Sequence, residues 1–273
     1  MSKFAEKPLI LVKLGGSIIT DDTQFLTPNE HVITHLLMTI TRYQDQFRFI
    51  IVHGAGSFGH PFAKTFSLSK GYQHANQLFG LIQTHQAMLE LNSLIISIGK
   101  EFGLHLLSFP PMSAVTMLNK RIKLWDLNPI KIALKNGFIP VTFGDVAFDE
   151  KLEFCILSGD QIVPFMANEL NAKKIYMLTD VPGVYEHFPD EKTLLKELNM
   201  NSKLFDKIFP EETVVQKTRV TGNMRSKLLE LEAVLKKDID TWVFTGLQPV
   251  VLDDHLAQKE KLEGTRLFWK EDQ

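Results

Sequence analysis

Short apolar segments rich in β-branched residues alternate with longer helical patterns along this chain of 273 residues, and most of these segments run into a glycine-bearing turn. The segments that predict strands are residues 9–14, 47–52, 138–143, 174–179 and 241–245. Strands that alternate with helices form mainly parallel sheets with helices on both faces. The alternation therefore predicts an α/β fold, an open αβα sandwich with a mainly parallel central sheet. An apparent hairpin tip at residues 147–152 predicts an antiparallel part of the sheet.

Helix signals lie between the predicted strands. At the start of the first predicted helix, Thr27 is a candidate N-cap, Pro28 suits the first helical position and Glu30 completes a capping box. A helix that begins there is expected to reach Tyr43. The other predicted helices are residues 77–101, 159–170, 224–237 and a helix that opens at Asp126 or Asn128 and ends at residue 136. The longest has a stripe that is expected to face the core, formed by Leu78, Leu81, Ile82, His85 and Leu89.

The composition excludes several classes of protein. The net charge is −2 and no basic tract occurs, so nucleic acid is not expected as a partner. Cys155 is the only cysteine, so no intrachain disulfide can form. No run approaches the roughly 20 apolar residues of a membrane span, and the N-terminus lacks the apolar core of a signal peptide. We therefore expect a cytoplasmic protein with no membrane partner.

Residues 53–60 form the most informative segment, in which a predicted strand runs into a turn with glycines at 54, 56 and 59. Glycine lets the backbone approach a ligand closely and aim several N–H groups at one anion. His60 closes the segment and can add a donor that is cationic near neutral pH. The segment therefore predicts a phosphate or carboxylate site with His60 as its specificity group. The alternative is a tight strand-to-helix turn without a ligand.

The glycine spacing also matches dinucleotide-binding folds, which need an acidic residue about 20 positions later to hold a ribose. No Asp or Glu occurs between Asp45 and Glu90, which disfavours a nicotinamide site. The chain also lacks the P-loop sequence and the protein-kinase motif set. Any nucleotide must therefore bind to another architecture.

Five glycine-bearing turns follow predicted strands or open predicted helices. They contain Gly16, Gly54, Gly144, Gly159 and Gly183. In an open α/β sheet such turns meet at the carboxyl ends of the strands, so five of them predict a large anionic ligand. Lys13 ends the first strand and Lys227 lies near the start of a predicted helix, an arrangement that suits phosphoryl transfer. The alternatives are a strand-end lysine that reaches solvent and a solvated helix residue.

Taken in order, these motifs resemble those of the amino acid kinase superfamily, and most closely those of its isopentenyl phosphate kinases. The resemblance spans almost the whole chain. The segments that carry it are residues 13–20, 51–63, 143–146, 156–161, 179–185, 220–222 with Met224 and Lys227, and 264–266. The segments 13–16 and 179–185 are shared across the superfamily. Residues 53–60 are more diagnostic, because His60 resembles the residue that binds the acceptor's phosphate in this subgroup.

The resemblance implies a single amino acid kinase domain over residues 1–273, usually homodimeric. An N-terminal lobe over about residues 1–157 would hold a small phosphorylated acceptor, and a C-terminal lobe over about residues 158–273 would hold ATP. ATP would donate its γ-phosphoryl group directly to isopentenyl phosphate, giving isopentenyl diphosphate for isoprenoid biosynthesis. Mg²⁺ would accompany the nucleotide, and no side chain is assigned as a metal ligand.

The resemblance also implies roles for individual residues. The catalytic residues would be Lys13, His60, Asp160 and Lys227. The residues that bind ATP would be Lys13, Gly15, Gly16, Ser17, Asp180, Gly183, Val184, Tyr185, Gly222, Met224 and Lys227. The residues that bind the acceptor would be Ala55, Gly56, Gly59, His60 and Gly159. The two lysines would stabilise charge on the transferring group, and Asp160 would orient them.

The chain departs from the subgroup at two places. Relatives commonly have a lysine shortly after the segment that matches residues 15–20, where this chain has Asp21 and Asp22. The usual Asp-Val-Thr-Gly-Gly-Met is changed by Arg219 and Asn223. These departures keep open a non-catalytic, nucleotide-binding regulator of the same fold.

A kinase for a phosphonate such as fosfomycin is a second alternative, because such relatives share a histidine at the acceptor loop. The two kinds of kinase differ in what their acceptor pocket must hold. An apolar pocket would favour isopentenyl phosphate, whereas a polar pocket would favour the phosphonate. The candidate apolar walls are Phe79, Ile82, Gln83 and Ile156.

Overall fold

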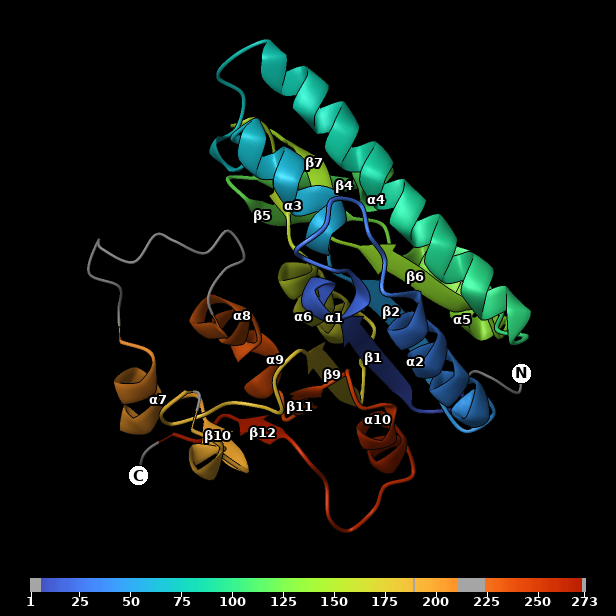
Figure 1. Ribbon diagram of the computed structural model, residues 1–273, viewed down its shortest axis with the longest axis vertical. Coiled ribbons are helices and arrows are strands. Elements are labelled where there is room, and N and C mark those ends of the chain that lie inside the picture. The colour runs from blue at the N-terminus through green and yellow to red at the C-terminus, as the bar shows by residue number, and fades with distance from the viewer. Residues whose placement is uncertain (1–5, 189, 211–223, 272–273) are drawn as a thin grey trace.

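The computed structural model describes residues 6–188, 190–210 and 224–271, and its core is one twisted eight-stranded sheet (Figure 1). In spatial order the strands are β10 (Glu197–Asn199), β12 (Thr265–Phe268), β11 (Asp240–Thr245), β9 (Lys174–Thr179), β1 (Leu9–Leu14), β2 (Arg48–His53), β6 (Ile139–Phe143) and β3 (Leu106–Ser108). Neighbouring strands are parallel except at the β11–β12 pair. The predicted αβα sandwich with a mainly parallel sheet is therefore confirmed.

A second, four-stranded sheet lies apart from the central one. Its strands are, in order, β5 (Arg121–Trp125), β4 (Val115–Leu118), β7 (Asp145–Asp149) and β8 (Glu153–Leu157). The antiparallel pair of β7 and β8 contains the predicted hairpin tip. The hairpin is thus confirmed, but it belongs to the second sheet, and β12 is what makes the central sheet mixed.

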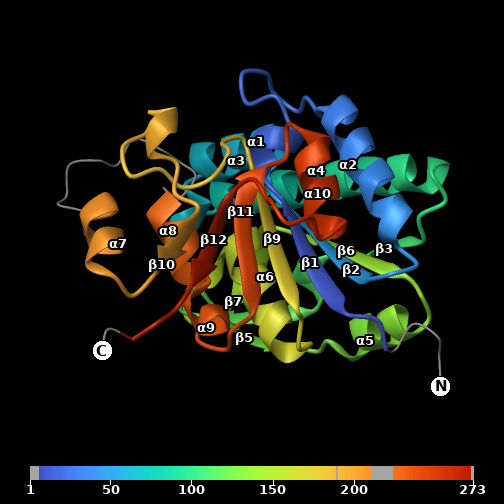
Figure 2. The ribbon, with the colours of Figure 1, turned by 90° about the horizontal axis from the view of Figure 1, so that it is seen from below.

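Alternation along β1 divides the core into two layers, which Figure 2 shows above and below the sheet. Leu9 and Leu11 pack with the second sheet and with one set of helices, whereas Ile10 and Val12 pack with another. The first set is α5 (Asn128–Lys135), α6 (Gly159–Glu169), α7 (Lys203–Ile208), α8 (Met224–Glu230) and α9 (Glu232–Leu235). The second is α1 (Gly16–Ile19), α2 (Glu30–Tyr43), α3 (Gly56–Thr65), α4 (Asn76–Glu101) and α10 (Pro249–Leu256). Short 3₁₀ helices are η1 (Leu68–Lys70), η2 (Pro111–Ser113) and η3 (Glu191–Thr193).

Helix α2 starts later than its sequence signals predict. Its N-cap is Asn29, whose side chain accepts the N–H of Val32, whereas Pro28 pairs with Thr20 in an isolated β-bridge. The prediction of Thr27 as N-cap was therefore wrong, because the chain before the helix is held in an extended conformation by its pairing with another segment. The end at Tyr43 is as predicted.

The buried face of α4 also differs from the predicted stripe. Leu78 and Ile82 are 48% and 50% exposed, whereas Leu81 is buried. The buried side instead includes Thr84, Ala87, Met88, Leu91 and Asn92. The buried face thus mixes apolar residues with small and polar ones, and it packs against α2, α3 and the strands β3, β6 and β7. The segment predicted as one helix over residues 224–237 is likewise divided, into α8 and α9.

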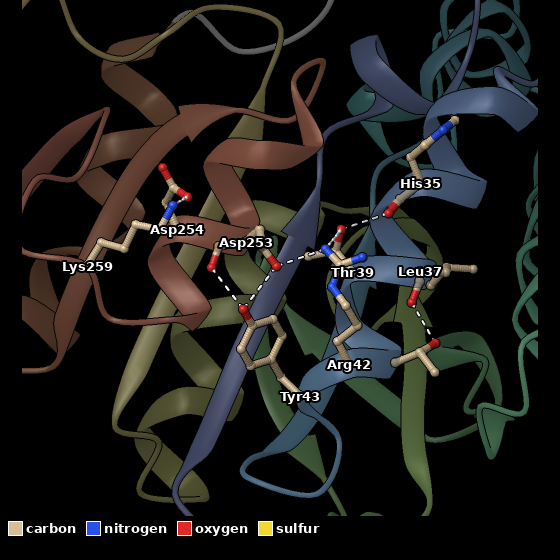
Figure 3. A network of polar contacts seen from close by, with 9 residues as sticks. His35, Leu37, Thr39, Arg42, Tyr43, Asp253, Asp254 and Lys259 are labelled. Atoms are coloured by element: carbon tan, nitrogen blue, oxygen red, sulfur yellow. Dashed lines mark hydrogen bonds and ion pairs between the residues drawn. The ribbon is translucent and has the colours of Figure 1, made fainter.

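The two halves of the chain are joined across the α2–α10 contact (Figure 3). Asp253 of α10 accepts hydrogen bonds from Arg42 at 2.8 Å and from Tyr43 at 3.0 Å, both near the end of α2. Within the described residues, no helix is long and apolar enough to cross a membrane.

Candidate active site

A cleft of about 1560 Å³ opens at the carboxyl ends of the central strands. Each of the five glycine turns contributes to its lining, through Gly16, Gly54, Gly144, Gly159 and Gly183. The strands β9, β1, β2 and β6 are adjacent and parallel, so the turns that follow them meet at the same edge of the sheet. The topology therefore brings segments that are far apart in sequence to one space.

Lys13 lies near the end of β1 on the side that packs against α6. Its buried ammonium is 2.7 Å from Oδ1 of Asp160, the second residue of α6. Ser158 caps this helix by accepting the N–H of Asp160, which holds the carboxylate in the first helical turn. Burial raises the pKa of Asp160, but Lys13 and Lys227 outweigh it and keep the pKa below its usual value. Asp160 is therefore charged and can hold Lys13 in place.

Lys227, in α8, faces the same cleft from the C-terminal half of the chain. Its burial and the charge of Lys13 lower its pKa, while the carboxylates of Asp160, Asp180 and Asp22 act in the opposite direction. The ammonium groups of Lys13 and Lys227 thus lie in one space with the carboxylates that act on them. A polyanionic ligand in the cleft would gain the attraction of both lysines.

The turns after β1 and β2 pack backbone against backbone. A Cβ on Gly16 would lie 2.4 Å from the nitrogen of Gly56, and a Cβ on Gly54 would lie 2.6 Å from the nitrogen of Gly16. Gly56 also has a φ of +46°, which favours glycine. The N–H groups of Gly16, Ser17 and Ala55 have no hydrogen-bond partner among the described residues. These donors are available to an anion in the cleft.

His60 is the fifth residue of α3, a helix that begins at Gly56 inside the segment predicted as a turn. It lines the cleft. Burial lowers its pKa, and Lys227 and Lys13 lower it further, against the opposing effect of Asp22. With these neighbours alone the neutral ring is favoured at pH 7, which differs from the expected cation. A dianionic phosphate beside the ring would raise the pKa and favour the cation.

The turn after β9 forms another wall of the cleft and is held by Thr265, the first residue of β12. Asp180, Gly183 and Val184 line the cleft. Thr265 accepts the N–H of Val184 at 2.8 Å and donates to the carbonyl of Leu195 at 2.6 Å. A Cβ on Gly183 would lie 2.5 Å from Oγ1 of Thr265, so the close approach requires glycine. The conformation of this turn thus depends on a residue some 80 positions away.

At the end of the cleft near α4, Asp145 and His85 form a pair with 2.8 Å between Oδ2 and Nδ1. The carboxylate of Asp145 is fully buried, which raises its pKa, and it also accepts the N–H of Val146. The hydrogen bond between Asp145 and His85 raises the pKa of His85. The pair therefore holds α4 against β7 where both border the cleft.

Apolar side chains also line this end, namely Ala63, Met88 and Ile156. Of the candidate walls, Ile156 lines the cleft, but Phe79, Ile82 and Gln83 do not. Phe79 lies outside, 58% exposed, with its ring against Phe66. Leu78, Phe79 and Ile82 at the start of α4 are thus exposed outside the cleft, and the residues of this helix that line the cleft are Thr84 and Met88.

Comparisons with known proteins agree with this architecture. The model of the amino acid kinase family matches residues 8–245. The isopentenyl phosphate kinase of Methanocaldococcus jannaschii is 31% identical over 274 residues, which cover 96% of this chain and 100% of the relative. The isopentenyl phosphate kinase of Methanothermobacter thermautotrophicus is 29% identical over 269 residues, which also cover 96% of this chain and 100% of the relative. A solved structure of isopentenyl phosphate kinase superposes with a TM-score of 0.81 at 27% identity, covering 95% of this chain and 99% of the other.

The chain belongs to the amino acid kinase family. The family predicted from the motifs is confirmed, and with it the enzyme class, an ATP-dependent phosphotransferase.

Most residues that the motifs pointed to lie around the one cleft of this family member. Those that line it are Lys13, Gly16, Ser17, Ala55, Gly59, His60, Gly159, Asp160, Asp180, Gly183, Val184, Tyr185, Met224 and Lys227. Gly15 and Gly56 do not line it. Gly15 instead donates its N–H to Leu178, and Gly56 packs against the turn after β1. Gly222, Arg219 and Asn223 lie outside the described residues.

Sequence reasoning missed the Asp145–His85 pair and the supporting role of Thr265. The turn at residues 144–145 and the motif at 264–266 were both recognised as motifs, but their partners are far away in the chain. Asp22 was recognised only as a departure from the family pattern, whereas the structure places it in the cleft. The only available signal for these residues was their place within motifs.

Proposed function

We propose that this enzyme transfers the γ-phosphoryl group of ATP to the phosphate of a small alkyl monophosphate, with isopentenyl phosphate as the preferred acceptor and isopentenyl diphosphate as the product. The observation that carries the proposal is the common position of Lys13, His60 and Lys227 around one cleft. Its volume of about 1560 Å³ leaves room for two phosphorylated substrates end to end. The names of the relatives support the choice of acceptor.

The transfer itself needs charge stabilisation more than covalent chemistry. An oxygen of the acceptor phosphate forms a bond to the γ-phosphorus, and the bond from that phosphorus to the bridging oxygen of ADP breaks. Lys13 and Lys227 stabilise the negative charge that is spread over the transferring group. Asp160 holds Lys13 through the 2.7 Å ion pair and does not itself exchange a proton.

The acceptor's phosphate lies against the start of α3. There His60, Gly59 and the N–H of Ala55 contact it, with Gly159 on the other side. A dianion at this place raises the pKa of His60, so binding is accompanied by protonation of the ring. An acceptor that carried only a carboxylate would favour this protonation less. The end of the cleft near α4, where Ala63, Met88 and Ile156 lie beside Thr84 and Asp145, receives the alkyl tail.

ATP occupies the side formed by the C-terminal lobe, residues 158–273, against Asp180, Gly183, Val184, Tyr185 and Met224. The N-terminal lobe, residues 1–157, holds the acceptor. Among the described residues, no group of three or more His, Cys, Asp or Glu could hold a metal ion. Mg²⁺ would therefore be bound mainly by phosphate oxygens, where it neutralises charge on the nucleotide.

We extend the proposal to a homodimer in the cytoplasm that supplies isoprenoid biosynthesis. Leu78, Phe79 and Ile82 at the start of α4 are each about half exposed and form an apolar surface that a second copy would cover.

The decisive experiment is an assay of ADP release with a panel of acceptors: alkyl phosphates of increasing tail length, fosfomycin, carbamate and acidic amino acids. We expect the highest kcat/KM with isopentenyl phosphate, and ³¹P NMR should show a diphosphate product. Transfer to fosfomycin alone would replace the proposal by a phosphonate kinase. ATP binding without transfer to any acceptor would instead indicate a regulator.

A further inference from the structure

His53, the last residue of β2, is fully buried beneath the acceptor loop and is not part of the cleft lining. Its ring stacks on Phe143 at 5.0 Å between centroids. Burial lowers its pKa to about 4, so the ring is neutral at pH 7. A neutral imidazole has one N–H donor and one acceptor nitrogen, and its two partners decide which nitrogen carries the proton.

The partners of His53 are consistent with a single arrangement of hydrogen atoms. Nδ1 is 3.1 Å from the carbonyl oxygen of Gly54, which can only accept, so Nδ1 carries the proton. Nε2 is then an acceptor and receives an N–H from Asn92 of α4 at 3.2 Å. The amide oxygen of Asn92 in turn accepts the hydroxyl of Ser108 at 2.5 Å. The result is a directional chain of donors from Ser108 through Asn92 and His53 to the Gly54 carbonyl.

This chain fixes the direction of the peptide between Gly54 and Ala55. In a planar trans peptide the C=O and N–H bonds point in opposite directions. Because the Gly54 carbonyl points to the His53 ring, the Ala55 N–H points away from that ring. Ala55 lines the cleft, and its N–H has no partner among the described residues. This N–H also lies at the N-terminus of α3, where an anion is favoured.

The preceding peptide, between His53 and Gly54, is held by two backbone hydrogen bonds. Gly54 donates its N–H to Leu14 at 2.8 Å, and Gly144 donates to the carbonyl of His53 at 3.0 Å. These two bonds do not restrain rotation of the Gly54–Ala55 peptide about the line that joins its two Cα atoms. The hydrogen bond from His53 to the Gly54 carbonyl restrains that rotation, together with the close packing of Gly54 and Gly56 against Gly16.

We propose that His53, Asn92 and Ser108 are positioning residues that hold the Ala55 N–H toward the acceptor's phosphate. This inference rests on the proposed function, since it assumes a phosphate at the start of α3. None of the three residues contacts the reacting atoms. They act through the orientation of one peptide, which a phosphate group would otherwise have to reorient on binding.

The kinetic test uses Asn92→Leu, which keeps the size of the side chain and removes the donor to His53. We expect the acceptor's KM to rise about tenfold, the loss of one hydrogen bond to a charged group, with the KM of ATP unchanged. Ser108→Ala should give a smaller rise of about twofold. The matched control is Thr142→Val on β6, which removes a buried hydroxyl that has no hydrogen-bond partner among the described residues. Equal acceptor KM values for folded Asn92→Leu and wild type would overturn the inference.

A spectroscopic test needs no substrate and so separates this inference from the proposed function. In ¹⁵N NMR spectra of the whole chain, His53 should appear as the neutral tautomer protonated at Nδ1 from pH 5 to pH 8. In Asn92→Asp the new carboxylate cannot donate, so Nε2 should gain a proton. Protonation of Nε2 in the wild type would refute the hydrogen-bond chain. Absence of any phosphoryl transfer by the wild type would refute the proposed function and leave the tautomer result standing.

Discussion

The two sides of the cleft are held in place by different physical means. Around the transferring group the side chains are charged, and Lys13 is held by the carboxylate of Asp160. Beneath the acceptor loop the support is neutral, since His53 and Asn92 form a hydrogen-bond chain in which no group is ionised at pH 7. The difference corresponds to the role of each side. The charged side stabilises negative charge on the transferring phosphoryl group, whereas the neutral side only orients the peptide between Gly54 and Ala55.

The energetic reason is the cost of a buried charge. An ionised side chain in the interior is stable only with a partner of opposite charge. The attraction between the two must offset the free-energy cost of removing both charges from water. Lys13 has that partner in Asp160 and also a task that only a cation can perform. A buried imidazole that merely orients a backbone carbonyl has no such task, so the neutral form is sufficient and burial enforces it.

The largest effect is expected where charge is removed from the transfer site. Lys13→Met should lower kcat by about 10²- to 10³-fold, the usual loss for one group that stabilises a transition state. ATP affinity, measured by calorimetry, should change much less. Lys174→Met is the matched control, because this lysine lies at the opposite end of the neighbouring strand β9. If only the KM of ATP rises in Lys13→Met, Lys13 is a binding residue and the contrast between the two sides is weaker.

A smaller kinetic effect is expected from substitution of His60, which lies in α3 and lines the cleft. His60→Gln should raise the acceptor's KM by about tenfold or more and leave ATP binding unchanged, because it removes a donor that becomes charged when a phosphate is bound. Since its neighbours lower the pKa of His60 before binding, acceptor binding at pH 7 should take up a proton. Calorimetry in buffers of different ionisation enthalpy measures that uptake.

The same uptake gives the pH dependence of acceptor binding. The wild-type KM for the acceptor should rise as the pH rises above the pKa of His60 in the complex, whereas the His60→Gln profile should be flatter. His35→Gln, at a half-buried position of α2 outside the cleft lining, is the control and should behave as the wild type. Equal proton uptake by wild type and His60→Gln would show that another group is protonated.

The smallest effect is expected for Asp149, a carboxylate whose role is structural. It accepts backbone N–H groups from Asn119, Lys120, Lys151 and Leu152 at the tips of the second sheet. Burial raises its pKa, but these bonds outweigh it and lower the pKa to about 2. Asp149→Asn should therefore reduce the free energy of unfolding at pH 7 by about 1–2 kcal/mol, with allowance for solvent screening, and leave kcat and KM unchanged.

The sign of this effect fixes its pH window. Because the folded pKa of Asp149 lies below the unfolded value of 3.8, its stabilisation is complete above pH 3.8 and is lost as the pH falls to about 2. Denaturant titrations of wild type and Asp149→Asn should thus converge at low pH. Glu150→Gln removes an exposed ion pair with Lys123 on the same sheet and should change stability little. A large kinetic effect of Asp149→Asn would show that the second sheet positions the cleft more directly than we propose.

Much of this fold could be predicted because its signals are local. The strand at residues 9–14, the cap at Ser158 and the helix that ends at Tyr43 are each determined by residues close to one another in sequence. The cap of α2 could not be predicted in the same way, since Pro28 is drawn into a bridge with Thr20. The buried face of α4 also depended on contacts with other elements, and the apolar pattern alone placed Leu78 and Ile82 on it, although both are about half exposed.

By itself the sequence determined that strands ending in glycine turns alternate with helices, that Lys13 and His60 lie next to such turns, and that Lys227 lies near the start of a helix. Parallel strands bring their carboxyl ends together, so these residues were expected to meet. The resemblance already implied that Asp160 would orient the lysines, and the structure adds its 2.7 Å pair with Lys13. Only the tertiary structure decided that His60 would be neutral before a phosphate binds and that Asn92 would orient His53. Ionisation states and hydrogen-bond directions depend on distances between groups far apart in the chain, and those distances exist only after the sheet and its helices have packed.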